Sequence, residues 1–91
     1  MRVVWTTSAV VDLARLHDFL VQVNPRAAAR VVQSLTGVAA RLLERPRLGE
    51  KLEQYAPREV RRILVDRYEL RYEITAAAIA ILRLWHTRER R

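Results

Sequence analysis

AIAILRLWHTRERR, residues 78–91, is the stretch that decides how this chain is expected to fold. Residues 78–85 are apolar apart from Arg83, and a short apolar run of this kind indicates a strand buried on both faces. The run ends at His86, and three arginines follow in the last four residues. A central strand is therefore expected to bring an imidazole and several guanidiniums to the edge of the domain, where they suit an acidic partner or phosphate. A solvated tail that simply ends the chain is the alternative.

Two further strands are expected directly before this run. Residues 68–74 alternate between apolar and charged side chains, which is typical of a half-buried strand. Residues 59–65 predict another strand, and Asp66-Arg67 supplies the turn between the two. Because short turns join all three strands, they are expected to form an antiparallel meander. Its last strand should lie in the middle of the sheet, beside a short β-rich run at residues 2–5.

The intervening segment predicts two helices. Thr6, Thr7 and Ser8 are candidate N-caps for a first helix that ends at Asn24-Pro25, and Asp12 should complement its dipole. A second helix is expected from Pro25 to Glu44, because Arg45 precedes a proline. Apolar stripes at three- and four-residue spacing should pack both helices as a hairpin. Residues 47–57 are expected to form a loop.

The predicted fold class is α+β in a single domain, residues 1–91. It comprises an N-terminal strand, an α-helical hairpin and a three-stranded antiparallel meander, which together form a four-stranded sheet packed by two helices. The face of the sheet away from the helices should carry Arg62, Glu69, Arg71 and Glu73, with Arg83 as a further candidate. Because a desolvated arginine needs a partner, Arg71 and Arg83 are either paired with Glu69 or Glu73 or presented to a ligand.

Composition narrows the functional classes. The formal net charge is +7, with sixteen arginines against a single lysine, so an acidic partner is expected, either nucleic acid or protein. A biased genome composition would give the same excess of arginine. The chain has no cysteine, and its two histidines are far apart, so no metal and no cofactor are expected. No signal peptide or membrane span is apparent, and a cytoplasmic location is the expectation.

Several short motifs resemble those of a known family. They are Trp5 before a capped helix with Asp12-Leu13, Asn24-Pro25 followed by Ala27-Ala28-Ala29, Pro46 and Gly49, Arg58-Glu59, Leu70-Arg71-Tyr72, and Ile81-Leu82-Arg83-Leu84 with His86 and Arg88. In this order and spacing the chain resembles the ParE/RelE toxin superfamily over nearly its whole length. The resemblance implies the fold above, a toxin of a type II toxin–antitoxin system, and a cognate acidic antitoxin as its partner in a hetero-oligomer.

The RelE-like branch of that superfamily cleaves mRNA on the ribosome. Attack by a 2′-hydroxyl needs a base, an acid and cations around the phosphate. Under this reading the catalytic candidates are Glu69, His86 and Arg88, with Arg62 as an additional cation. His86 could equally make a structural hydrogen bond. Glu69 stands where RelE-like members commonly carry an arginine, and no tyrosine follows Arg88.

The ParE-like branch, whose members poison DNA gyrase, is the better match for the hairpin motif with Asn24-Pro25, the Leu70-Arg71-Tyr72 strand and the short His86-x-Arg88 ending. Such a toxin need not be an enzyme, and the last strand with its tail becomes an interaction surface. The residues expected to bind the target or the partner are Arg62, Arg71, Arg83, His86, Arg88 and Arg90. A plain nucleic-acid-binding domain is the third hypothesis, and the lack of predicted solvent-facing stacking aromatics counts against it.

Overall fold

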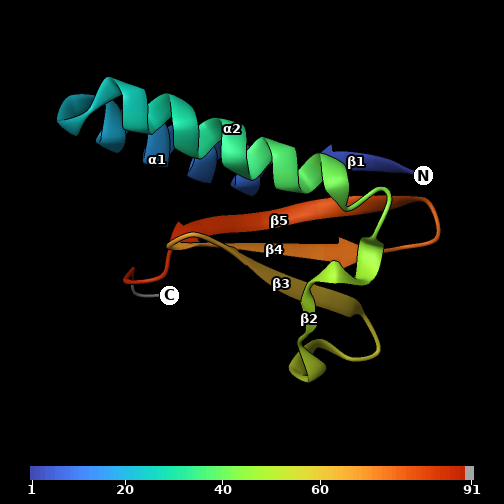
Figure 1. Ribbon diagram of the computed structural model, residues 1–91. Coiled ribbons are helices and arrows are strands. Elements are labelled where there is room, and N and C mark those ends of the chain that lie inside the picture. Colours follow the sequence, from blue (N-terminus) through green and yellow to red (C-terminus); the bar gives the residue numbers. More distant parts are fainter. Residues whose placement is uncertain (90–91) are drawn as a thin grey trace.

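The computed structural model, described over residues 1–89, is a five-stranded mixed sheet with two long helices on one face (Figure 1). The strand order is β1-β5-β4-β3-β2, in which β1 is parallel to β5 and the other neighbours are antiparallel. The elements are β1 (Arg2–Trp5), α1 (Thr7–Val23), α2 (Pro25–Arg41), β2 (Glu50–Lys51), β3 (Glu59–Val65), β4 (Tyr68–Ile74) and β5 (Ala78–His86), with short 3₁₀ turns at Pro46–Leu48 and Glu53–Tyr55. The predicted α+β class and the central position of the last strand are confirmed.

Polar side chains begin both long helices, as predicted. The hydroxyl of Thr6 accepts a hydrogen bond from the Ala9 amide at 3.1 Å, which identifies Thr6 among the three candidate caps of α1. The side-chain oxygen of Asn24 accepts from the amides of Arg26 and Ala27, and a proline follows at the first position of α2. These caps satisfy amides that have no partner within the helix.

The second helix ends at Arg41, three residues before the predicted end at Glu44. The Leu43 amide bonds the Ala40 carbonyl and the Glu44 amide bonds the Arg41 carbonyl, so the chain tightens into turns there. Tightening of this kind is common at helix ends. The proline after Arg45 prevents the helix from continuing, as predicted, but the helix already ends several residues before it.

The sheet has five strands rather than the predicted four, because β2 lies within the segment that was expected to be a loop. Glu50 and Lys51 pair with Arg62 and Arg61 of β3. The chain can approach β3 closely because residue 49 is glycine: a Cβ there would lie 2.5 Å from the Arg62 carbonyl oxygen. A two-residue strand is too short to produce an alternating pattern, and this explains why the sequence did not predict it.

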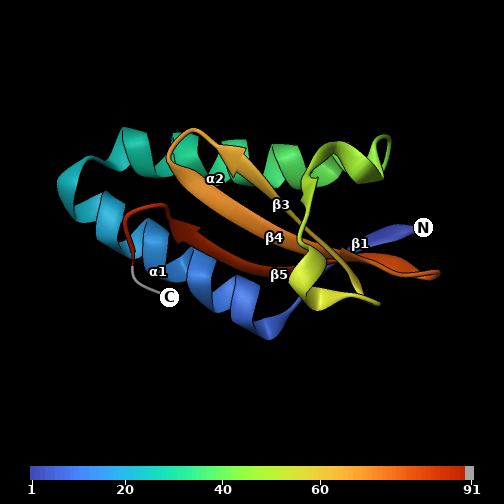
Figure 2. The same cartoon turned by 90° about the horizontal axis from the view of Figure 1, so that it is seen from below.

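The core lies between the sheet and the helix pair. Its largest fully buried side chains include Leu35, Leu42, Leu70, Tyr72, Ile79, Ile81 and Leu84. The buried hydroxyl of Tyr72 donates to the Pro46 carbonyl at 2.7 Å and accepts from the Gly49 amide at 2.9 Å, which ties the linker after α2 to the sheet. Burial raises the pKa of Tyr72. Both long helices pack on this one face, so the other face is left for polar side chains (Figure 2).

A β-bulge in β5 decides which side chains reach that other face. Tyr72 pairs with Ile81 and Arg71 pairs with Arg83, so Leu82 is an extra residue in β5. Strict alternation from Ile81 would have pointed Arg83 into the core. The bulge shifts the phase by one residue, so that Leu84 is fully buried while Arg83 is half-exposed.

Candidate interaction face of the sheet

The candidate site is the face of β3, β4 and β5 away from the long helices, called here the open face. It carries Arg62, Glu69, Arg71, Glu73, Arg83 and Trp85. The first five are the residues that the sequence predicted for this face. A groove of about 720 Å³ lies on it. Tyr55, Arg58, Arg71, Leu82, Arg83 and Trp85 are among the residues that line it.

Arg71 is one of the residues that line this groove. Its Nε donates to Glu69 at 2.8 Å, and a terminal nitrogen donates to the Tyr55 hydroxyl at 2.9 Å. Its guanidinium carbon lies 4.9 Å from the centroid of the Trp85 ring, within range of a cation–π interaction. Glu69 is therefore the internal partner of Arg71 that the sequence offered as one of two alternatives. These contacts hold the guanidinium between Glu69, Tyr55 and the Trp85 ring.

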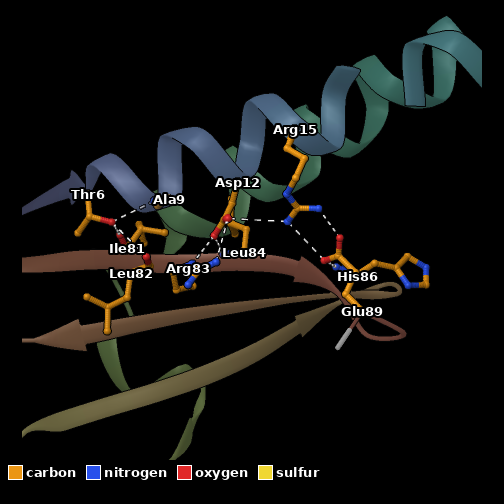
Figure 3. Close-up of polar contacts among 10 residues, drawn as sticks. All are labelled: Thr6, Ala9, Asp12, Arg15, Ile81, Leu82, Arg83, Leu84, His86 and Glu89. Carbon is orange, nitrogen blue, oxygen red and sulfur yellow. Dashed lines mark hydrogen bonds and ion pairs between the residues drawn. The ribbon is translucent and has the colours of Figure 1, made fainter. Parts of the chain in front are cut away.

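Arg83 pairs with a residue that the sequence did not suggest as its partner. Its Nε donates to Asp12 of α1 at 2.7 Å, and a terminal nitrogen donates to the other oxygen of Asp12 at 3.2 Å (Figure 3). Neither Glu69 nor Glu73 fills this role. The guanidinium carbon of Arg83 also lies 5.6 Å from the Trp85 ring centroid, so that two arginines flank one indole.

Asp12 does not have the helix-dipole role predicted for it, because it lies beyond the first turn of α1, where the effect of the dipole has fallen off. Beyond Ile81, where pairing with β1 ends, α1 lies alongside the edge of β5. There Asp12 accepts a hydrogen bond from the Leu84 amide at 2.9 Å, and the Thr6 hydroxyl bonds the carbonyls of Ile81 and Leu82. Burial opposes ionisation of Asp12, but the hydrogen bonds from Arg83 and Leu84 outweigh it and lower its pKa. A buried carboxylate thus replaces a neighbouring strand at this edge.

The end of β5 is fastened to the same helix. Arg15 makes an ion pair with Glu89, and Glu89 accepts a hydrogen bond from the His86 amide at 2.8 Å (Figure 3). Arg15 also lies 3.7 Å from Asp12. The charges of Asp12, Arg15, Arg83 and Glu89 therefore form one network that joins α1 to the C-terminal end of the sheet.

Arg62, which was predicted for the open face, and Arg58, which lines the groove, are also paired with carboxylates. Arg58 donates two hydrogen bonds to Glu73, at 3.0 and 2.8 Å, and lowers the pKa of that carboxyl. Arg62 donates to Glu50 of β2 at 2.7 Å and lies 3.8 Å from Glu69. The guanidiniums of this face are thus held in place by carboxylates of the same chain.

The structure does not bring the three catalytic candidates together. Glu69 pairs with Trp85 in the sheet register and belongs to the open face. His86 pairs with Tyr68, its ring lies 5.3 Å from the Tyr68 ring, and it borders an apolar hollow beside Phe19 of α1. His86 points to the same face as its partner Tyr68, and Glu69, the next residue after Tyr68 in β4, points to the opposite face. Glu69 and His86 therefore lie on opposite sides of the sheet.

The remaining candidates lie in or beyond the turn after β5. The Arg88 amide donates to Nδ1 of His86 at 3.1 Å, which is the structural hydrogen bond considered as the alternative role for this histidine. The Arg88 side chain is exposed, and Arg90 lies outside the described residues. Sequence reasoning missed Asp12, Tyr55 and Arg58 as parts of the site. Asp12 and Arg58 each belonged to a motif of the family resemblance, Asp12-Leu13 and Arg58-Glu59, but nothing local marked Asp12 as facing Arg83.

Other kinds of site are not evident within residues 1–89. The structure shows there no group of three or more histidine, cysteine, aspartate or glutamate side chains that could hold a metal ion. In the same range, no helix is both long and apolar enough to span a membrane.

Comparisons with known proteins identify the family. Residues 3–91 match the model of the ParE toxin of the type II toxin–antitoxin system parDE. The chain is 34% identical to Toxin RelE2 of Caulobacter vibrioides over 85 residues. The aligned region covers 93% of each of the two proteins.

Two solved structures share the fold. A chain of the chromosomal ParDE toxin–antitoxin system from P. aeruginosa superposes with a TM-score of 0.78 at 24% identity, covering 94% of this chain and 95% of that one. A chain of the toxin–antitoxin complex RelBE2 from Mycobacterium tuberculosis superposes with a TM-score of 0.58 at 31% identity, covering 93% of this chain and 95% of that one. The chain therefore belongs to the ParE/RelE toxin family and is a toxin of a type II toxin–antitoxin system.

Proposed function

We propose that this toxin poisons DNA gyrase in the manner of the ParE-like branch, without catalysing a reaction of its own. The observation that carries the proposal is the separation of Glu69 and His86 by the sheet. A ribonuclease needs its acid and base on one scissile phosphate, within hydrogen-bond reach of the groups they serve. An interaction poison needs instead a rigid surface, and the paired arginines around Trp85 supply one.

The proposed inhibitor of the toxin is an acidic antitoxin that is partly disordered on its own and folds on the toxin. A net charge of +7 favours an acidic partner, and both solved relatives belong to systems named as toxin–antitoxin pairs. Binding should be tight and should weaken with salt. The test is to look for a gene beside the toxin that encodes a small acidic protein, to co-express the two and to purify them through a tag on the toxin; absence of any such partner would contradict the pairing.

The test of the target is a pair of assays on the purified full-length toxin. In the first, gyrase, ATP and relaxed plasmid are incubated with toxin, and detergent and protease are then added to denature and digest the protein. Linear plasmid that accumulates with toxin reports trapped cleavage. An unrelated protein of equal positive charge is the control, because a basic protein that merely coats DNA would slow supercoiling without trapping breaks.

The second assay uses ribosomes programmed with a defined mRNA. The gyrase proposal expects intact mRNA and trapped, cleaved plasmid. Cleaved mRNA with normal supercoiling would overturn it. Glu69→Gln and His86→Ala, made singly, would then show whether either side chain takes part in RNA cleavage.

A RelE-like endonuclease is the alternative function, favoured by one feature of the open face. Arg71 and Arg83 flank the indole of Trp85, and Tyr55 is within 6.0 Å of the Arg71 guanidinium. Guanidiniums beside aromatic rings suit an unstacked RNA strand. Under this alternative, cations rather than an acid–base pair would supply most of the stabilisation of the transition state.

A further inference from the structure

The arginines of α2 have no carboxylate beside them. Arg26, Arg30 and Arg41 are exposed, and none of them makes an ion pair within residues 1–89. The sequence contains no aspartate or glutamate from residue 19 to residue 43. Glu44, in the turn after α2, is the nearest carboxylate along the chain and forms no ion pair with them in the described structure.

These three side chains share one face of the helix. At 3.6 residues per turn they fall within a sector of about 60°, and the rise per residue spreads them over about 22 Å. Gln33, Ser34 and Gly37, which lie between them, are also exposed. In Figure 1, α2 is an outer element of the molecule. The result is a straight, uncompensated row of cations, called here the α2 arginine row (Arg26, Arg30 and Arg41).

The side chains around the row suit phosphates better than an acidic protein. A protein partner that docks on a helix normally inserts apolar or aromatic anchors, and the polar face between the arginines offers none. Exposed apolar side chains are found instead on α1, where Val11, Phe19 and Val23 are more than half exposed. A guanidinium with no carboxylate partner is suited to paired hydrogen bonds with phosphate oxygens.

The geometry also favours duplex DNA over a single strand. Single strands are bound by stacking their bases on aromatic side chains, and α2 has no aromatic residue. Phosphates of one DNA strand recur about every 3.4 Å along the axis, so a 22 Å row spans about six of them. We propose that the outer face of α2 binds the phosphodiester backbone of duplex DNA through Arg26, Arg30 and Arg41. This binding is independent of sequence and does not require the gyrase proposal to be correct.

The proposal is tested with full-length toxin and a short fluorescent duplex of random sequence, titrated at several salt concentrations. In R26Q/R30Q/R41Q, affinity should fall at least about tenfold at low salt, and the slope of log affinity against log salt should fall by about 2.7, or 0.9 for each lost phosphate contact. R26K/R30K/R41K keeps the charges and should retain most of the affinity. Thermal unfolding of each variant checks that it is folded.

The matched control removes the same charge elsewhere. Arg2, Lys51 and Arg67 are exposed cations on β1, on β2 and in the turn after β3, and none has an ion pair within the described residues. R2Q/K51Q/R67Q should keep the affinity for DNA within about twofold and keep the slope within about one unit. An equal loss in both triple variants would overturn the proposal, because binding would then depend on net charge alone.

Three other outcomes would also overturn it. Unchanged DNA binding by R26Q/R30Q/R41Q would place the DNA contacts elsewhere. Tighter binding to single-stranded RNA that depends on the same arginines would make RNA the ligand. Loss of antitoxin affinity in that variant, with DNA affinity unchanged, would assign the row to an acidic protein. None of these readouts involves gyrase, so the failure of this proposal is distinguishable from failure of the proposed function.

Discussion

The open face and the outer face of α2 are both rich in arginine, yet they use it in opposite ways. On the open face, Arg58, Arg71 and Arg83 each donate hydrogen bonds to a carboxylate of the same chain. On α2, no residue of the arginine row is paired within the described part of the chain. Net charge therefore says little about where this protein attracts an anion, because a paired guanidinium has its charge offset locally.

The two regions also differ in what their arginines do for the fold. Arg71 and Arg83 flank Trp85 and join β4, β5 and α1, so their removal should disturb packing as well as charge. The α2 arginine row contacts solvent, and its removal should leave the fold intact.

Asp12→Ala should have the largest effect. It leaves the Leu84 amide without its acceptor and removes the carboxylate that holds Arg83. The free energy of unfolding should fall by about 2–4 kcal/mol, which urea denaturation will measure. Asp18→Ala, an exposed change on the same helix, should stay within about 0.5 kcal/mol. Equal losses for both variants would show that Asp12 is not a structural link.

Arg71→Gln should destabilise the protein by about 1–3 kcal/mol. The change removes hydrogen bonds to Glu69 and the Tyr55 hydroxyl and the contact with the Trp85 ring. Arg30→Gln is the matched change on α2 and should have an effect of less than about 0.5 kcal/mol. The difference between the two melting temperatures measures the contrast directly; if Arg30→Gln proved the more harmful, the division into two kinds of arginine would be wrong.

Acid below about pH 4 should reveal the contribution of the paired carboxylates to stability. The pKa values of Asp12, Glu59 and Glu73 are all lowered by arginine partners, so the folded state favours their ionised forms. The stability they contribute is complete above their unfolded pKa values near 4 and is lost as the pH falls through the lower folded values. Between pH 7 and pH 4 only a small part should be lost, with a steeper decline below. The midpoints of urea denaturation, measured from pH 7 to below pH 4, will show this loss of stability.

Asp12→Asn sharpens the acid experiment. This variant cannot lose a proton at residue 12, so its stability should start lower and decline less steeply below pH 4. Parallel pH curves for the variant and the wild type would mean that Asp12 has no lowered pKa in the folded protein.

The smallest effect is expected for R26Q/R30Q/R41Q. Its free energy of unfolding should change by less than about 0.5 kcal/mol, and the sign should favour stabilisation, because Arg26 and Arg30 repel each other at a four-residue spacing. Urea denaturation at low salt is the measurement. A loss of more than about 1 kcal/mol would show that these arginines support the fold, and the two faces would then differ less than the structure suggests.

Much of the fold followed from local patterns. The bounds of β3 and β4 were predicted correctly, since residues 68–74 alternate and a two-residue turn precedes them. In that turn Asp66 has a positive φ of 55°, a conformation that aspartate tolerates. The cap at Asn24 followed from the proline after it. Each of these features depends on residues close together in the sequence.

The site was predicted less completely, because its parts meet only in the folded chain. Glu69 and Arg71 are two residues apart on one strand, so their pairing was among the expected alternatives. Asp12 and Arg83 are 71 residues apart, and no local pattern joins them. Glu69 was predicted near the start of one strand and His86 at the end of the neighbouring strand, so the two were suggested as an acid–base pair. That prediction did not consider which face of the sheet each side chain occupies, and the structure places them on opposite faces.

The sequence by itself determined the order of the elements, the central apolar strand and the excess of positive charge, because helix caps, alternation and composition act locally. Only the tertiary structure decided the phase of β5. The bulge at Leu82 turns Arg83 and Trp85 to the open face, and Asp12 fixes it by holding both the Arg83 guanidinium and the Leu84 amide. A one-residue shift in register changes little in the local backbone, but it exchanges the side chains on the two faces of a strand. The choice between the two possible registers of β5 therefore depended on its packing against α1.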